Sequence, residues 1–160
     1  VGPSGVAAAV AGALSEHGCR TVVVPSGLDP SWRAAAEGVA RVLSDDEATT
    51  HLARDDVDAV VTASAVGVAT TGTIVLDHGA DQGRRELTLV PDTHVCVIRA
   101  DQVVHDVPES VARLRPGPDG ARPLTWISGP SATSDIELER VEGVHGPRTL
   151  VVVLVEGADA

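Results

Sequence analysis

The sequence predicts an α/β fold built on a mostly parallel sheet with helices on both faces. In the first third, helical segments alternate with short apolar runs. Those runs are almost continuously apolar, which is typical of parallel strands buried on both faces. With 160 residues, of which 43% are hydrophobic, the chain is long enough for one core but too short for two. We therefore expect a single domain over residues 1–160.

Caps and breakers mark the elements of the first third. Gly18 ends the first helix, while Asp29 and Pro30 suit the N-cap and first position of the second. Ser44 and Glu47 form a capping box that opens the third. The predicted helices are residues 4–17, 29–37 and 44–54, and the predicted strands are residues 21–24, 39–43 and 58–62.

The middle of the chain does not continue the alternation of helices and strands. Residues 63–77 have no helical period and offer two β-like runs, 65–69 and 73–76, on either side of a Thr-Thr-Gly turn, which predicts a β-hairpin insert. The elements expected after it are a loop at 78–86, strand 94–98, helix 108–114, a surface loop at 116–120, strand 124–128, a short helix at 135–141, a loop at 143–147, strand 150–155 and a frayed tail.

Composition excludes several classes of function. A net charge of −11 and the lack of a basic stripe argue against nucleic acid as a partner. The chain has no Lys and no Tyr, which removes phosphate-loop lysines, pyridoxal Schiff bases and phenolic acids. The two cysteines, Cys19 and Cys96, are far apart and next to predicted strands, so we expect both to be reduced and buried. We therefore predict no cofactor and no iron–sulfur cluster in this chain.

Hydropathy argues against a membrane protein. The longest apolar run, Leu150–Val155, is strand-sized, and Val1–Leu14 lacks the basic start of a signal peptide. We therefore expect a cytoplasmic protein. The chain begins with Val and contains no Met, so we expect that its native N-terminal segment is missing.

A first candidate site follows the strand predicted at 124–128. If that strand is parallel, the loop after it lies at the carboxyl edge of the sheet, where helix starts bind anions. Gly129 would let the backbone approach a ligand, and Ser131, Thr133 and Asp135 are the candidate ligand-binding side chains. The alternative is structural, because Ser134 to Glu137 is itself a capping box.

Thr71, Gly72 and Thr73 form a second hydroxyl-rich loop with donors for a carboxylate or phosphate. Its alternative interpretation is a β-turn with Gly72 at positive φ. Arg84 and Arg85 are adjacent, and we expect only one of them to face inward.

His145 lies between two Gly-containing pairs, where an imidazole is free to act as an acid or base near neutral pH. With Glu137 it is the candidate catalytic group. Its spacing from Asp135 and Glu137 permits a mononuclear metal site, but no second His lies at helix spacing, so we predict no metal. The other histidines look isolated and receive no role: His17, His51, His78, His94 and His105.

Four sequence blocks together resemble the LUD-domain family of the lactate utilization protein C type: Thr71–Asp77, Leu89–Val95, Ile127–Glu137 and Gly143–Arg148. They occur in the family's order. The resemblance implies a three-layer Rossmann-like fold related to the sugar-phosphate isomerase and CoA-transferase group. It also implies a role with two partner subunits, one of which carries iron–sulfur clusters, in the oxidation of L-lactate to pyruvate.

One position departs from the family pattern. Family members usually carry Glu in the middle motif where this chain has Thr70, which removes an acid–base role for that carboxylate. The chain also lacks clustered cysteines and a recognised flavin or nicotinamide fingerprint, so it cannot by itself carry electrons from lactate. Together with the resemblance, this predicts a non-redox subunit of an iron–sulfur lactate-oxidising complex, which binds a small anion or its partner subunits. The alternatives are a pure scaffold and a free-standing isomerase or acyl-transfer enzyme acting on a phosphorylated or CoA-linked substrate, with Glu137 or His145 as base.

Overall fold

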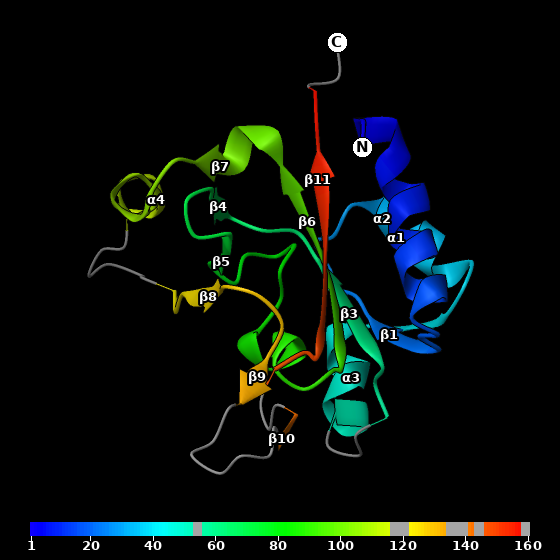
Figure 1. The fold of residues 1–160 in the computed structure, drawn as a ribbon. Coiled ribbons are helices and arrows are strands. Elements are labelled where there is room, and N and C mark those ends of the chain that lie inside the picture. Colours follow the sequence, from blue (N-terminus) through cyan, green and yellow to red (C-terminus); the bar gives the residue numbers. More distant parts are fainter. Residues whose placement is uncertain (53–55, 116–121, 134–140, 143–145, 158–160) are drawn as a thin grey trace.

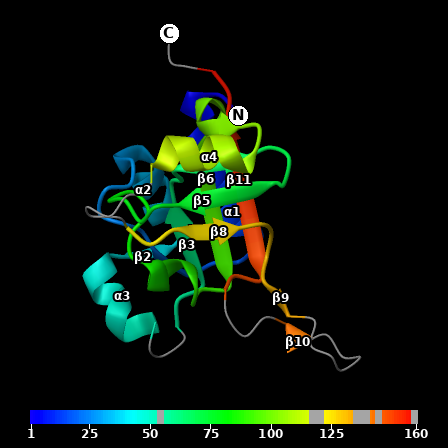
Figure 2. The same cartoon turned by 90° about the vertical axis from the view of Figure 1, so that its left-hand side faces the viewer.

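A computed structural model describes residues 1–52, 56–115, 122–133, 141–142 and 146–157. The described part has three layers (Figure 1). Helices α1 (Val6–Glu16) and α2 (Pro30–Glu37) cover one face of a parallel sheet, and a second, smaller sheet stands on the other side. The predicted α/β class with a mostly parallel sheet is confirmed. Helices also lie on the second face, where α3 (Asp45–Leu52) packs against the sheet, and the smaller sheet covers much of the rest of that face (Figure 2).

The parallel sheet has the order β11-β6-β3-β1-β2. Its strands are β1 (Thr21–Val23), β2 (Arg41–Leu43), β3 (Ala59–Thr62), β6 (Thr93–Arg99) and β11 (Thr149–Val155). All four pairings are parallel. The order reverses between β1 and β3, as in doubly wound folds.

The smaller sheet has the order β7-β4-β5-β8 and contains the predicted hairpin. Strands β4 (Val66–Val68) and β5 (Thr73–Leu76) pair antiparallel, as expected. Two further strands extend the hairpin at its edges: β7 (Val103–Val104), which was not predicted, and β8 (Thr125–Ile127). Strand β8 runs antiparallel to β5, so its expected place in the parallel sheet is wrong.

Alternation along the parallel strands divides the core in two. Val22, Val61, Val95 and Val153 pack with α1 in the largest cluster. Their neighbours in sequence point the other way. Val23 and Val60 meet α3 (Asp45–Leu52) and the 3-10 helix η2 (Arg85–Thr88), and Cys96 meets Ile74 and Leu76 of β5. The second face of the parallel sheet therefore looks onto β5 and β8.

The remaining elements are the 3-10 helices η1 (Pro3–Gly5) and η3 (Ala100–Gln102), helix α4 (Val107–Leu114) and two short paired strands, β9 (Ala132–Thr133) and β10 (Val141–Glu142). None of the helices in the described part of the chain has the length and apolar character needed to span a bilayer.

Two predicted boundaries are corrected. The strand expected at 39–43 begins at Arg41, because the N–H groups of Val39 and Ala40 both bond to the Ala36 carbonyl and continue α2. Val141, expected at the end of a helix, lies in β10. The rest of that helix, residues 135–140, and the core of the 143–147 loop lie outside the described residues, as does most of the 116–120 loop.

Candidate functional site

Separate sequence motifs meet at the amino ends of β6 and β11. Thr73 Oγ1 lies 2.8 Å from Ser128 Oγ and 2.7 Å from Thr71 Oγ1, which joins the hydroxyl-rich turn to the end of β8. The Ser131 N–H donates to the Pro147 carbonyl at 2.7 Å. Two loops predicted as separate ligand sites are therefore parts of one structure.

A third motif contacts the same structure. The Gly146 N–H donates to the Leu89 carbonyl at 2.8 Å, which ties the segment before β11 to the segment before β6. All four sequence blocks named above therefore contribute to one small region. It lies between the parallel sheet and β8 (Figure 1).

This region forms a half-open cavity of about 160 Å³. The lining comes from the loop after β8, from the segment before β11, from β8, from the end of η2 and from the amino ends of β6 and β11: Thr88, Leu89, His94, Thr125, Trp126, Ile127, Ser128, Gly129, Ser131, Gly146, Pro147 and Leu150. Gly129 and Gly146 have φ of +118° and +97°, a region that favours glycine. Their backbone conformation allows the two loops to turn around the cavity.

His94 is the polar group that the sequence analysis missed. It lies in β6 with an exposed fraction of 0% and borders the cavity. Its Nε2 lies 2.8 Å from Thr62 Oγ1, whereas Nδ1 is a buried side-chain atom without a hydrogen-bond partner among the described residues. The available signal was its position: alternation along β6 places His94 on the same face as Cys96, toward the second sheet.

Burial sets the protonation state of the site. It lowers the pKa of His94 to about 4, so the imidazole is neutral near pH 7. Burial also raises the pKa of the neighbouring Cys96 thiol to about 12. Among the described residues, the cavity lining therefore carries no formal charge at neutral pH and offers hydroxyls and backbone groups. Such a lining suits a small, uncharged or singly charged polar ligand.

The predicted site residues lie in different parts of the structure. Gly129 and Ser131 line the cavity. Thr73 is buried and its hydroxyl contacts Ser128. Thr71 and Gly72 lie in an exposed turn, and Gly72 has φ of +61°, as the β-turn interpretation requires. The backbone of Thr133 lies in β9. Asp135, Glu137 and His145, the acid–base and metal candidates, lie outside the described residues.

At the carboxyl ends of β1 and β3, the chain itself lies in the crevice. Ligands of doubly wound folds bind where the strand order reverses, here between β1 and β3. In this protein the Gly27 N–H donates to the Ala80 carbonyl at 2.9 Å, and the Ala63 N–H to the Asp81 carbonyl at 3.0 Å. The loop after β5 thus fills the usual ligand crevice.

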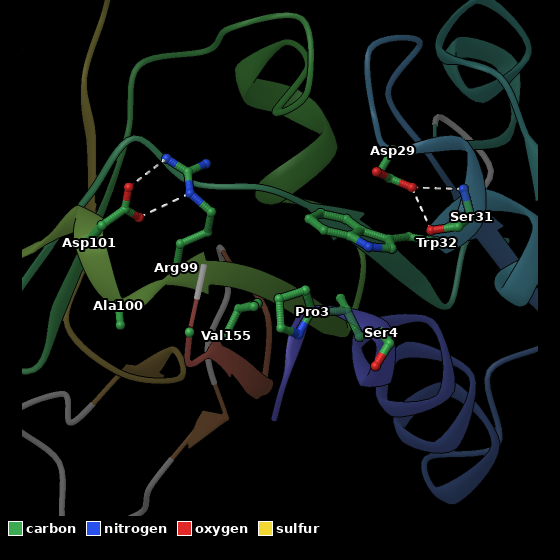
Figure 3. Close-up of a pocket in the computed structure, with 11 residues that line it drawn as sticks. Pro3, Ser4, Asp29, Ser31, Trp32, Arg99, Ala100, Asp101 and Val155 are labelled. Atoms are coloured by element: carbon green, nitrogen blue, oxygen red, sulfur yellow. Dashed lines mark hydrogen bonds and ion pairs between the residues drawn. The ribbon is translucent and has the colours of Figure 1, made fainter. Parts of the chain in front are cut away.

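A larger cavity of about 840 Å³ lies near the carboxyl ends of β6 and β11 (Figure 3). Its charged groups already have partners within the chain. Arg99 Nε lies 3.0 Å from Asp101 Oδ1, and Asp29 accepts from the Ser31 hydroxyl and N–H. Asp29 is the predicted N-cap of α2, so its carboxylate serves the helix. These contacts give no indication of a ligand, so the candidate site is the cavity beside His94.

The two adjacent arginines behave as predicted, since only Arg84 faces inward. Its Nε donates to Asp45 Oδ1 at 2.5 Å and one terminal nitrogen donates to Thr49 Oγ1 at 2.7 Å, which holds η2 against α3. Arg85 is exposed. Cys19 and Cys96 are both buried and unpaired, as expected.

Comparison with known proteins supports the resemblance. The family model described as LUD domain matches residues 20–155. A Deinococcus radiodurans protein named Lactate utilization protein C is 51% identical over 147 residues, which is 92% of this chain and 67% of that protein. A Bacillus licheniformis protein of the same name is 31% identical over 60% of this chain and 41% of its own length.

The fold has a solved counterpart. The crystal structure of a DUF162 family protein from Deinococcus radiodurans superposes with a TM-score of 0.78 at 41% sequence identity, over 98% of this chain and 85% of that one. The chain spans about two thirds of the length of the Deinococcus relative and less than half of the Bacillus relative. The family match and the extent of these similarities show that the chain belongs to the LUD domain family.

Proposed function

We propose that this chain takes part in lactate utilisation as a non-redox component, which binds a small carboxylate in the cavity beside His94 and docks on iron–sulfur partner subunits in the cytoplasm. The observation that carries the proposal is the arrangement of the four sequence blocks: three of them line one cavity, and the fourth supports it through the contact of Thr73 with Ser128. The name of the Deinococcus relative supports the pathway.

The size of the cavity supports a small ligand. A volume of about 160 Å³ corresponds to roughly five water molecules at about 30 Å³ each. The hydroxyl of Ser128, which lines the cavity, is able to donate to a carboxylate.

The thiols support the non-redox role. Burial raises the pKa of both Cys19 and Cys96, which disfavours the thiolates that metal clusters and disulfide chemistry require. Electrons from lactate would then pass through partner subunits.

The partner surface that fits best is the edge of the parallel sheet. Strand β11 is the last strand of its sheet, and Val152 and Leu154 on it are 46% and 40% exposed. At the carboxyl end of this edge, Val1 donates to the Leu154 carbonyl and accepts from the Glu156 N–H, both at 2.8 Å. The part of the strand edge before Leu154 is the place where another chain would add.

Affinity capture from lactate-grown cells of the source organism tests the assembly. The tagged chain is expected to retain an iron–sulfur protein and L-lactate oxidation activity. Leu154→Lys should weaken this capture, whereas Val111→Lys, at a similarly exposed position (42%) on α4, should not. Capture without any iron–sulfur protein would contradict the subunit role. Turnover of a sugar phosphate or CoA ester by the purified chain would favour the enzyme alternative.

A further inference from the structure

We propose that three arginines beyond the carboxyl end of β1 form a binding site for a small polyanion, a ligand with two or more negatively charged oxygens. Arg84, Arg85 and Arg122 line a cavity of about 510 Å³ that shares no lining residue with the cavity beside His94. The site goes beyond the proposed function, because it requires neither lactate nor a partner subunit.

The position of the cavity is one where doubly wound folds bind ligands. Ser26, which follows β1, lines it together with Gly79, Ala80 and Gly83 of the loop after β5. That loop lies in the crevice between β1 and β3, where the Gly27 N–H donates to the Ala80 carbonyl. A ligand at this end of the sheet would therefore contact the loop and the arginines next to it.

Two of the three arginines have no partner in the described part of the chain. Arg84 donates to Asp45, the acidic residue of the lining, and to Glu86. No ion pair or hydrogen bond joins the guanidinium groups of Arg85 and Arg122 to any described residue. Although the whole chain has a net charge of −11, this cavity therefore presents two positive charges that are available to a ligand.

Two carboxylates lie near Arg122 but border a different cavity. Asp77 and Asp81 line that neighbouring cavity, and Asp77 Oδ1 accepts from Gln82 Nε2 at 2.8 Å. They reduce the local positive potential without using the guanidinium hydrogens of Arg122. Direct hydrogen bonds from the arginines, more than long-range attraction, should therefore hold the ligand.

The imidazole of His78 joins the two segments that carry the arginines. Its Nδ1–H donates to the Gly83 carbonyl at 3.0 Å, and its Nε2 lies 2.8 Å from Thr125 Oγ1. Gly83 immediately precedes Arg84, and Thr125 follows closely after Arg122. The cavity is therefore formed before a ligand arrives, which lowers the entropic cost of binding.

Charge and size together define the ligand class. A guanidinium group matches the paired oxygens of a phosphate or carboxylate group. A monocarboxylate contacts one such group and leaves the second positive charge without a partner. The volume of about 510 Å³ equals roughly seventeen water molecules at about 30 Å³ each, which is enough for a phosphate ester or a tricarboxylate.

Calorimetric titration of the purified chain with pyrophosphate, citrate and lactate tests the ligand class. Low ionic strength is used because salt screens exposed charges. We expect at least one polyanion to bind roughly tenfold or more tightly than lactate. Binding of pyrophosphate alone would support a phosphorylated ligand, and binding of citrate alone a polycarboxylate. Equal affinity for lactate, or no binding of either polyanion, would overturn the inference.

Variants of the two unpaired arginines locate the site. Arg85→Gln and Arg122→Gln should each weaken polyanion binding roughly tenfold. Arg122→Lys keeps the charge but loses the guanidinium geometry, so it should weaken binding severalfold. Arg20→Gln, at an exposed position before β1, removes the same charge far from the cavity and is the matched control. An equal loss in Arg20→Gln would mean that net charge, and not this cavity, determines binding.

Affinity capture separates this site from the proposed function. The double variant Arg85→Gln/Arg122→Gln should retain the iron–sulfur partner as well as the wild type does, and Leu154→Lys should keep the wild-type affinity for the polyanion. If neither polyanion binds and the double variant loses the partner, the arginines contact an acidic protein surface and the small-ligand inference is wrong. Capture that fails only in Leu154→Lys would leave the polyanion site standing.

Discussion

Thr73 Oγ1 and Ser128 Oγ lie 2.8 Å apart, although 55 residues separate them in the chain. The contact connects the start of β5 with the end of β8, which are antiparallel neighbours. Thr73 is buried, whereas Ser128 lines the cavity. The hydroxyl of Thr73 therefore holds a cavity residue in place without lining the cavity itself.

Replacing Thr73 with Val should lower the free energy of unfolding by about 1 kcal/mol, because its hydroxyl bonds to both Thr71 and Ser128 are lost. Urea unfolding measures the change. Thr70→Val is the matched control, since Thr70 is exposed in the same turn, and should change stability little. Equal effects of the two substitutions would show that the Thr73–Ser128 contact contributes nothing.

Local sequence signals predicted the helices of the first third well, because their ends depend on neighbouring residues. Asp29 accepts from the Ser31 N–H, and Ser44 and Glu47 form the expected capping box. The turn at Gly72, where φ is positive, was also predicted from neighbouring residues. Caps and turns depend on contacts within a few residues, so sequence spacing reveals them.

Strand partners could not be predicted in this way. An apolar run such as Thr125–Ile127 has the same local pattern whether it joins the parallel sheet or a second one, and its pairing with β5 depends on residues about 50 positions away. His94 was missed for a related reason. Its role arises from Thr62 and from loops that only the fold brings near.

A second prediction concerns the contributions of the adjacent Arg84 and Arg85 to stability. Arg84→Ala should lower the free energy of unfolding by about 1 kcal/mol, because its bonds to Asp45 and Thr49 join η2 to α3. Arg85→Ala removes the same charge from an exposed neighbour and should be nearly neutral. Thermal unfolding at low and high salt compares them. Similar losses in both variants would point to net charge as the cause, not to the contacts of Arg84.

A third prediction concerns the loop after β5, which lies in the crevice at the carboxyl ends of β1 and β3. A Cβ on Gly27 would lie 2.6 Å from the Ala80 carbonyl carbon, so the backbone itself would have to move. Gly27→Ala should therefore cost about 1–3 kcal/mol, as over-packing does, and should speed hydrogen exchange in the loop after β5.

Gly12→Ala provides the contrast, because a Cβ at this position in α1 meets nothing within 4 Å. It should leave stability unchanged or raise it by up to about 1 kcal/mol through helix propensity. A neutral Gly27→Ala would mean that the loop leaves the crevice easily, and the crevice would then be open to ligands.

The buried imidazole of His94 makes stability depend on pH in a defined window. Its pKa in the folded protein, about 4, is below the ordinary value of 6.5, so the unfolded chain binds the proton more readily. The stability that comes from the neutral ring is fully present above about pH 6.5 and is lost as the pH falls toward 4. At about 1.4 kcal/mol per pKa unit, the loss reaches about 3 kcal/mol.

Urea unfolding of the wild type and His94→Gln across pH 4 to 8 measures this contribution as a difference, since the other titrating groups are common to both. The variant is less stable at pH 7, because it disturbs the contact with Thr62. Its free energy of unfolding should fall less steeply below pH 6.5, so the two curves converge toward pH 4. Parallel curves would mean that the ring takes up a proton as readily in the folded protein as in the unfolded chain.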